Sequence, residues 1–136
     1  MQTAKDVMRT DIKTIRRSAT LIEAAQMLLE HQISGLPVTD DSGLLVGIIS
    51  EFALLAITYE PFSCRQTVDD HMSRQVICVT PDTPLKELAD TFILHRIRRL
   101  PVTENGRLVG MVSRRELLRA TLESGGPICS AQAVAT

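Results

Sequence analysis

The sequence contains two copies of the same pattern. Pro37 recurs as Pro101, at an offset of 101 − 37 = 64 residues. The same offset relates Met8 to Met72, Leu21 to Leu85, Glu23 to Glu87, Ala25 to Ala89, His31 to His95, Ile33 to Ile97 and Leu36–Thr39 to Leu100–Thr103. After one residue is dropped, an offset of 113 − 50 = 63 relates Gly43 to Gly106, Leu45–Gly47 to Leu108–Gly110, Ser50 to Ser113 and Leu54-Leu55 to Leu117-Leu118. Each copy is about 60 residues, longer than the ~20–50-residue periods of solenoids. The chain is therefore a tandem pair of small domains, and a cleft between two related halves is a natural ligand site.

Length and composition limit the classes of protein that the chain can belong to. A copy of about 60 residues buries too little apolar surface to be comfortable alone, so the two copies are expected to share one core. Tryptophan is absent and aromatic residues make up only 3% of the 136 residues, which argues against a stacking surface for single-stranded nucleic acid. The net charge of −1 provides no general attraction for DNA or RNA, so no nucleic-acid partner is expected.

Cysteine usage and hydropathy predict a cytoplasmic protein. The cysteines are Cys64, Cys78 and Cys129, an odd number with no pair at metal-ligand spacing. No signal peptide is recognisable, so a reducing compartment is the simplest interpretation. The longest apolar runs, such as 44–49, are far too short to span a bilayer, and no membrane insertion is expected.

Each copy predicts the element order β-α-β-β-α. Extended segments at 12–15 and 76–79 come first, amphipathic helices follow from Leu21 and Leu85, and each hairpin precedes a helix that starts after Ser50 or Ser113. The fold class is α+β, with the two copies forming one pseudo-two-fold module. The predicted boundaries are repeat 1 at 4–58, a linker at 59–67, repeat 2 at 68–122 and a flexible C-terminal tail at 123–136.

Local signals predict the helix starts and the role of two strand glycines. Thr20-x-x-Glu23 resembles a capping box, and in the second copy Thr83 is the expected N-cap with Pro84 at the first helical position. Gly47 and Gly110 lie within predicted strands, where glycine more often allows close backbone approach than it cradles phosphate. His31 and His95 fall in the last turn of a helix, which favours capping or packing over metal binding.

The motifs around the hairpins resemble those of the CBS domain family. The first copy reads Ile-Ser-Gly-Leu-Pro-Val-Thr-Asp and Leu-Val-Gly-Ile-Ile-Ser, and the second reads Ile-Arg-Arg-Leu-Pro-Val-Thr-Glu and Leu-Val-Gly-Met-Val-Ser-Arg-Arg-Glu-Leu-Leu. Two copies in register, over roughly residues 4 to 122, resemble a stand-alone CBS pair, or Bateman module. The resemblance implies clefts between the repeats that bind AMP, ADP, ATP, S-adenosylmethionine or sometimes NAD, and a disc-shaped dimer that regulates a partner.

The resemblance also implies roles for particular residues. The family signature Ser/Thr-x-x-Asp at the start of the last helix matches Ser113-Arg114-Arg115-Glu116, with Glu116 in place of Asp. Ser113 and the helix N-terminus would hold phosphate, Glu116 the ribose, and Arg98 and Arg99 further phosphate oxygens. The opposite half would wrap the base with the segment around Lys13 and with Ile33, Ser34 and Gly35.

The second site of the pair departs from the signature. It reads Ser50-Glu51-Phe52-Ala53, and Ala53 offers no acceptor for a ribose. One cleft is thus expected to be cationic and the other degenerate. Each site residue also has a structural interpretation, because Ser113 is a good N-cap without any ligand and an acid such as Glu116 is favoured in a first helical turn.

Two functional hypotheses follow from these residues. The first is a regulatory adenine-nucleotide sensor that works as a homodimer on a separate, unknown partner protein. The alternative is a ligand-free dimerisation or docking module with degenerate sites. No catalytic constellation, cofactor or metal site is recognised, so an enzyme is not expected. The resemblance implies that the helices at 52–57 and 116–122 form the dimer contact, and both stretches are rich in apolar residues.

Overall fold

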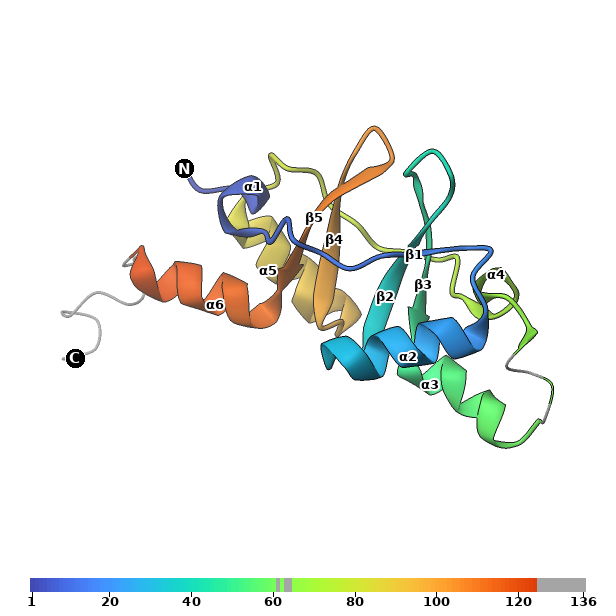
Figure 1. Ribbon diagram of the computed structural model, residues 1–136. Helices are drawn as coiled ribbons and strands as arrows, with labels where there is room; N and C mark the ends of the chain where they lie inside the picture. The colour runs from blue at the N-terminus through green and yellow to red at the C-terminus, as the bar shows by residue number, and fades with distance from the viewer. Residues whose placement is uncertain (61, 63–64, 125–136) are drawn as a thin grey trace. The chain divides into compact units, whose positions relative to one another are not determined.

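The computed structural model describes residues 1–60, 62 and 65–124 and confirms an α+β protein built from two similar repeats (Figure 1). The elements in chain order are α1 (Ala4–Val7), β1 (Ile15–Arg16), α2 (Leu21–His31), β2 (Gly35–Thr39), β3 (Leu45–Ser50), α3 (Glu51–Leu54), the 3-10 helix η1 (Leu55–Thr58), α4 (Val68–His71), α5 (Leu85–His95), β4 (Arg99–Glu104), β5 (Arg107–Ser113) and α6 (Arg114–Glu123).

The chain divides into two compact units whose boundaries differ from those of the sequence repeats. Unit 1 consists of residues 1–11, 78–104 and the described residues from 109 onward. Unit 2 consists of residues 12–77 and 105–108. The start of each repeat therefore belongs to the unit built mainly from the other repeat, so the two repeats exchange their first segments.

Unit 2 is a three-stranded sheet, ordered β1-β2-β3, covered by helices. β1 runs parallel to β2 with Ile15 opposite Val38, and β2 runs antiparallel to β3 with Leu36 opposite Ile49. Thr20 caps α2 by accepting a hydrogen bond from the backbone N–H of Glu23 at 3.2 Å, which confirms the predicted helix start. The buried core residues are Ile15, Leu21, Ala24, Leu28, Leu36, Val38, Ile49, Leu54, Val68 and Met72.

The exchanged segment of repeat 2 completes this core. Val68 is fully buried and its N–H donates to the carbonyl of Ala19 at 2.7 Å. Ser73 forms an antiparallel bridge with Ile48, through N–H···O contacts of 2.9 and 3.0 Å. The expectation of one core shared by the two copies was therefore only partly right. The chain forms two compact units, and the repeats share a core in unit 2 because α4 brings residues of the second repeat into it.

Unit 1 repeats the arrangement with the roles of the repeats reversed. β4 and β5 form its hairpin, and Val79 bridges Val102 in parallel as β1 bridges β2. The exchanged N-terminal segment adds Ala4, which is fully buried and donates its N–H to the carbonyl of Thr83 at 2.8 Å. The buried apolar residues of unit 1 are Ala4, Leu88, Phe92, Leu100, Val102, Val112, Leu117 and Ala120.

Two strand glycines make room for the exchanged segments. A Cβ on Gly47 would lie 2.7 Å from the backbone oxygen of Ser73 and 2.9 Å from Cγ of Met72. A Cβ on Gly110 would lie 2.8 Å from Cγ of Met8. The prediction that these glycines allow close approach is confirmed, since methionine and glycine recur together at the repeat offset.

The second hairpin turn and the start of α5 were both predicted from local sequence. The Asn-Gly turn of the second hairpin has φ of 54° at Asn105 and 81° at Gly106, as a two-residue hairpin turn with matched twist requires. The predicted cap of α5 was wrong by one position. Pro84 itself is the N-cap, with extended backbone, while the Thr83 hydroxyl accepts a hydrogen bond from the N–H of Thr80 at 3.2 Å.

We expect the stability of unit 2 to depend on pH through Asp69, which lies in the exchanged segment. Arg74 and Arg17 contact its carboxylate at 3.2 and 2.9 Å and hold the pKa of Asp69 below its ordinary value of 3.8, with the Arg74 hydrogen bond contributing most. A carboxylate with a depressed pKa in the folded state stabilises above its unfolded pKa and loses that contribution as pH falls through the folded pKa. Asp69→Asn should therefore lower the free energy of unfolding at neutral pH, and the difference should shrink below roughly pH 4.

Urea unfolding of the wild type and Asp69→Asn between pH 7 and pH 3 measures this difference. Asp41→Asn is the matched control, because Arg16 contacts Asp41 at 3.2 Å but both side chains are highly exposed. A stability gap for Asp69→Asn that stays constant down to pH 3 contradicts the assignment.

Candidate ligand-binding site

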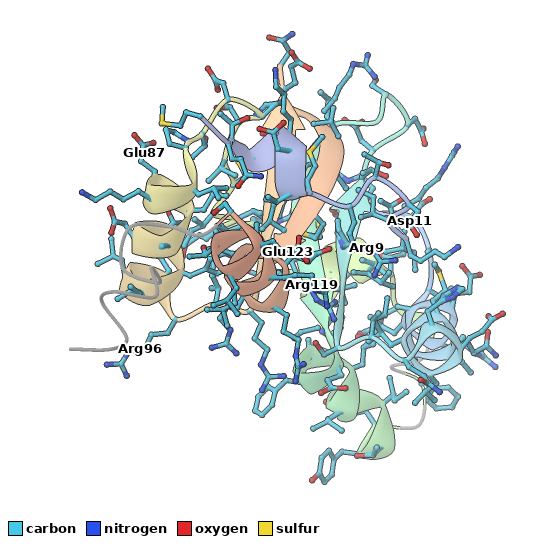
Figure 2. All side chains as sticks on the ribbon, turned by 90° about the vertical axis from the view of Figure 1, so that its left-hand side faces the viewer. Arg9, Asp11, Glu87, Arg96, Arg119 and Glu123 are labelled. Atoms are coloured by element: carbon cyan, nitrogen blue, oxygen red, sulfur yellow. The ribbon has the colours of Figure 1, made fainter. Side chains whose placement is uncertain are left out.

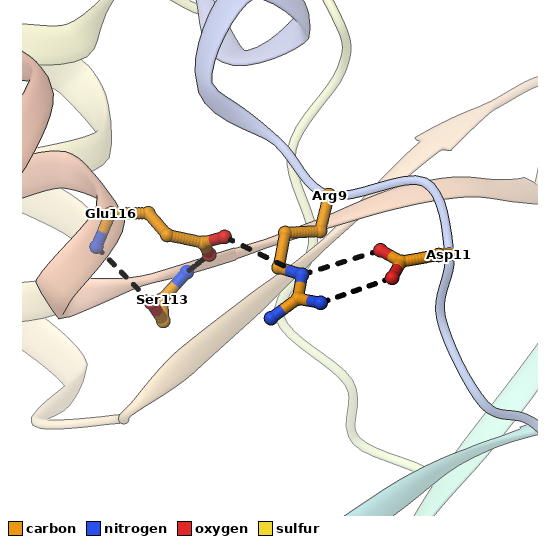
Figure 3. A network of polar contacts seen from close by, with 4 residues as sticks. All are labelled: Arg9, Asp11, Ser113 and Glu116. Atoms are coloured by element: carbon orange, nitrogen blue, oxygen red, sulfur yellow. Dashed lines mark hydrogen bonds and ion pairs between the residues drawn. The ribbon is translucent and has the colours of Figure 1, made fainter.

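The N-terminus of α6 is closed by a reciprocal capping box. The Ser113 hydroxyl accepts from the N–H of Glu116 at 3.2 Å, and Glu116 Oε1 accepts from the N–H of Ser113 at 2.8 Å (Figure 3). The motif forms because a serine followed three residues later by glutamate satisfies two N–H groups that a helix end otherwise leaves free. Ser113 and Glu116, both predicted site residues, therefore contact each other directly.

Arg9 adds a cation to this end of unit 1. Its guanidinium pairs with Asp11, with Nη2 at 3.0 Å from Oδ2, and its Nε lies 4.0 Å from Glu116 Oε2 (Figure 3). The backbone of Arg9 is held by two hydrogen bonds with Met111, at 2.9 and 3.0 Å. The sequence analysis missed Arg9. Nothing in its local sequence points to Glu116, because the two meet only through the exchange of the N-terminal segment.

Arg98 and Arg99 lie at the same end of unit 1. The N–H of Arg114 donates to the carbonyl of Arg98 at 3.2 Å, which ties the residues before β4 to the start of α6. Arg98 is exposed and Arg99 is half-buried. Other arginines of unit 1 carry the positive charge further, and Figure 2 shows Arg96 beyond the end of α5 and Arg119 on α6. The backbone of Arg98 thus lies beside the helix N-terminus that Ser113 and Glu116 cap, and Arg99 follows it as the first residue of β4.

The equivalent end of unit 2 has no carboxylate at the position of Glu116. The Ser50 hydroxyl accepts from the N–H of Ala53 at 3.5 Å, and the N–H of Glu51 donates to the carbonyl of Ser34 at 2.9 Å. No carboxylate closes the cap, because position 53 is an alanine, and its side chain packs against the core of unit 2. Both units have a serine N-cap at this position, whereas the carboxylate of Glu116 and the arginines at 98 and 99 have no counterpart in unit 2, where Ala53, Ser34 and Gly35 stand instead.

The residues assigned to the base all belong to unit 2. Lys13 is exposed and precedes β1. The side chain of Ile33 is half-buried and packs against the core of unit 2. Gly35 lies opposite Ser50 in the β2–β3 ladder, which places Ser34 and Gly35 beside the N-terminus of α3.

The described residues were compared with the expectations for metal binding and membrane insertion. Within residues 1–60, 62 and 65–124, no group of three or more His, Cys, Asp or Glu side chains is arranged to hold a metal ion. His31 and His95 are the last residues of α2 and α5, as predicted. Cys64 and Cys129 lie outside the described residues, and Cys78 is exposed. Among the helices described, none combines the length and apolar character needed to cross a bilayer.

A comparison with models of protein families identifies the family of the chain. The model for the CBS domain matches twice, at residues 4–59 and 68–123. The chain belongs to the CBS domain family. Its two matches cover nearly the same segments as the two sequence repeats.

Solved structures of CBS pairs resemble the chain over most of its length. One is CBSX2 of Arabidopsis thaliana in complex with AMP, 31% identical with a TM-score of 0.81, covering 91% of this chain and 98% of that chain. Another is the CBS domain pair of protein MJ0100 in complex with 5-methylthioadenosine and S-adenosyl-L-methionine, 27% identical with a TM-score of 0.76, covering 91% and 98%. These two CBS pairs bind adenosine-type ligands.

Among curated relatives, the CBS domain-containing protein YhcV of Bacillus subtilis is 29% identical over 118 residues, covering 86% of this chain and 84% of YhcV. The chain spans only 41%, 23% and 13% of the length of three others. Some of these longer relatives are enzymes that carry CBS domains. The CBS pair therefore occurs both as most of a small protein and as a module within larger ones.

Proposed function

We propose that this CBS pair is a regulatory, non-catalytic module that binds an adenosine-type ligand of the AMP, ADP, ATP or S-adenosylmethionine class. It acts in the cytoplasm as a homodimer on a separate partner protein. The observation that carries the proposal is the capping box of Ser113 and Glu116 at the N-terminus of α6, with the backbone of Arg98 bonded to Arg114 beside it. The ligands bound by CBSX2 and the MJ0100 pair support the ligand class.

Each group in unit 1 has a chemical role in this proposal. The helix N-terminus and the Ser113 hydroxyl favour an anion, and guanidinium groups of Arg98 and Arg99 form charge-assisted hydrogen bonds with phosphate. The Glu116 carboxylate can accept from ribose hydroxyls. Lys13 and the backbone of Ile33, Ser34 and Gly35 contribute to binding of the base. The site around Ser50 and Ala53 is the weaker one, because it lacks a carboxylate.

One observation favours the alternative of a ligand-free dimerisation or docking module. Around α6, the N–H groups of Ser113, Arg114 and Glu116 already have protein acceptors. A ligand must displace or share the Glu116 carboxylate, and hydrogen bonds to charged groups are worth roughly 1.5–3 kcal/mol each. The capping box therefore stabilises the empty state in competition with the ligand.

A thermal-shift panel of AMP, ADP, ATP, S-adenosylmethionine and NADH separates the two functions. A ligand at ~100 times its Kd adds about 2.7 kcal/mol of stability, so a genuine ligand gives a clear shift. No shift with any of the five supports the docking module instead.

Calorimetry with the best ligand of the panel tests the residues. We expect one molecule bound per chain, with Arg99→Ala weakening AMP about tenfold and adenosine less, since only AMP carries the phosphate. Glu116→Ala should weaken both. Lys86→Ala is the matched control, because it removes an exposed cation of unit 1 from a different helix. Two equal sites per chain, or unchanged AMP affinity in Ser113→Ala/Arg99→Ala, would show that the site assignment is wrong.

A further inference from the structure

The guanidinium of Arg9 lies between two carboxylates of unit 1. Its Nε and Nη2 donate to the two oxygens of Asp11 at 3.3 and 3.0 Å, which makes a bidentate pair (Figure 3). Its Nε also faces Glu116 Oε2 at 4.0 Å, a distance too long for a hydrogen bond. The pKa of Arg9 is raised above its ordinary value first by the hydrogen bond and charge of Asp11 and then by the charge of Glu116. Asp11 is therefore the stronger partner of Arg9, and Glu116 the weaker.

The two oxygens of the Glu116 carboxylate have different contacts. Oε1 accepts from the N–H of Ser113 at 2.8 Å in the capping box, whereas Oε2 lies toward Arg9. The Glu116 side chain is only 17% exposed, so its charge is screened less by water and salt than a surface charge. Oε2 is thus the oxygen that a ribose hydroxyl can share without breaking the cap, as long as the guanidinium stays on Asp11.

The three charged residues occur together in unit 1 and are all replaced in unit 2. Arg9 and Asp11 recur at the repeat offset of 64 and Glu116 at the offset of 63, and the equivalent positions carry no charge: Ser73, Gln75 and Ala53. The ion pair and the carboxylate are thus present as a set or absent as a set.

Folding alone gives no reason for the Arg9–Asp11 pair. The backbone bridge of Arg9 to Met111 recurs in unit 2 as the bridge of Ser73 to Ile48, where no ion pair accompanies it. The side chains of Arg9 and Asp11 are 64% and 73% exposed, and exposed ion pairs contribute little to stability. The pair is better explained by the carboxylate beside it.

We infer that Asp11 is a positioning residue of the proposed ligand site, which holds Arg9 off Glu116 and so keeps Glu116 Oε2 available to a ribose hydroxyl. This role rests on the proposed function. Without the Asp11 carboxylate, the guanidinium turns to the acid already beside it, since arginine pairs with carboxylates through two parallel hydrogen bonds. A ribose hydroxyl then has to displace a charge-assisted bond, and the affinity for the ligand falls.

Calorimetry with adenosine tests this role, because adenosine carries the ribose without a phosphate. Asp11→Asn should weaken adenosine about tenfold, the effect of one hydrogen bond to a charged group. Arg9→Gln/Asp11→Asn should recover most of the loss, because no guanidinium is then left to occupy Glu116. The matched control is Asp41→Asn, which removes an acid from the similarly exposed pair of Arg16 and Asp41 and should leave the affinity unchanged. AMP replaces adenosine as the probe if only AMP binds.

The outcomes separate this role from the proposed function. Unchanged affinity in Asp11→Asn, together with weakened binding in Glu116→Ala, overturns the role and leaves the ligand site intact. A double variant that binds as weakly as Asp11→Asn also overturns it, because Asp11 then acts by supporting the fold. Binding of neither adenosine nor AMP by the unmodified chain removes the proposed function itself, and this role with it.

Nuclear magnetic resonance of the arginine side chains tests the same exchange of partners without any ligand. The Arg9 Nε–H resonance should shift in Asp11→Asn and shift again when Glu116→Gln is added, because glutamine keeps the capping box but not the charge. In the unmodified background, Glu116→Gln should move this resonance much less. A resonance that ignores Glu116→Gln in the Asp11→Asn background shows that Arg9 does not turn to Glu116, and the role of Asp11 fails while the proposed function stands.

Discussion

A fragment of residues 12–77 should keep structure that a fragment of residues 1–62 loses. The longer fragment contains Val68 and Met72, which are 0% and 7% exposed in the core of unit 2, and the shorter one ends before them. Burying side chains of this size is worth about 1.5–3 kcal/mol each, and a domain of some 60 residues has only about 3–9 kcal/mol in total. Removing both side chains, with the backbone bonds of Ser73 and Val68, should therefore unfold unit 2.

Far-UV circular dichroism and a proton–nitrogen NMR spectrum of both fragments measure the difference. Residues 63–136 should also fail alone, because they lack Ala4, which is fully buried in unit 1. The matched control is residues 12–77 with Val68→Asp, which has the same length and a charge in the core. Dispersed spectra from residues 1–62 would show that the exchanged segment is dispensable.

Gly47→Ala should be strongly destabilising, whereas Gly35→Ala in the adjacent strand should be nearly neutral. A Cβ at position 47 meets the backbone oxygen of Ser73 at 2.7 Å, and backbone of a bridged strand cannot move aside cheaply. A Cβ at position 35 has its nearest neighbour, the carbonyl oxygen of Ile49, at an ordinary 3.4 Å. Overpacking costs about 1–3 kcal/mol, so we expect a fall in Tm on the order of 10 °C for Gly47→Ala.

Thermal unfolding of the two variants, followed by circular dichroism, checks this prediction. Gly110→Ala is an informative third variant. The three atoms nearest to its Cβ all belong to the side chain of Met8, which is flexible, so its effect should be smaller than that of Gly47→Ala. Equal effects in Gly35→Ala and Gly47→Ala would mean that the close approach of the exchanged segment contributes little to stability.

The capping box of α6 shows how far local sequence can predict a site. Ser113 and Glu116 are three residues apart, so their reciprocal bonds depend on helix geometry alone and were open to prediction. The same spacing left two roles possible, a cap and a ligand contact. The structure gives Glu116 a bond to its own helix, and any ligand has to compete with it.

The repeat, the amphipathic helices, the hairpin turn at Asn105-Gly106 and the contrast between Glu116 and Ala53 could all be predicted from the sequence. These depend on short-range spacing and on comparison of the two copies. The element order β-α-β-β-α was predicted only in part, because the short helices α1 and α4 were missed and the segment 76–79 forms an isolated bridge at Val79 in place of a strand. Three features could be seen only in the folded protein. The repeats exchange their first segments, Arg9 lies beside Glu116, and Leu54 and Leu117 face inward. The reason is physical. A backbone ladder such as that between Arg9 and Met111 joins residues far apart in the chain, and both an exchanged and an unexchanged pairing present the same local pattern.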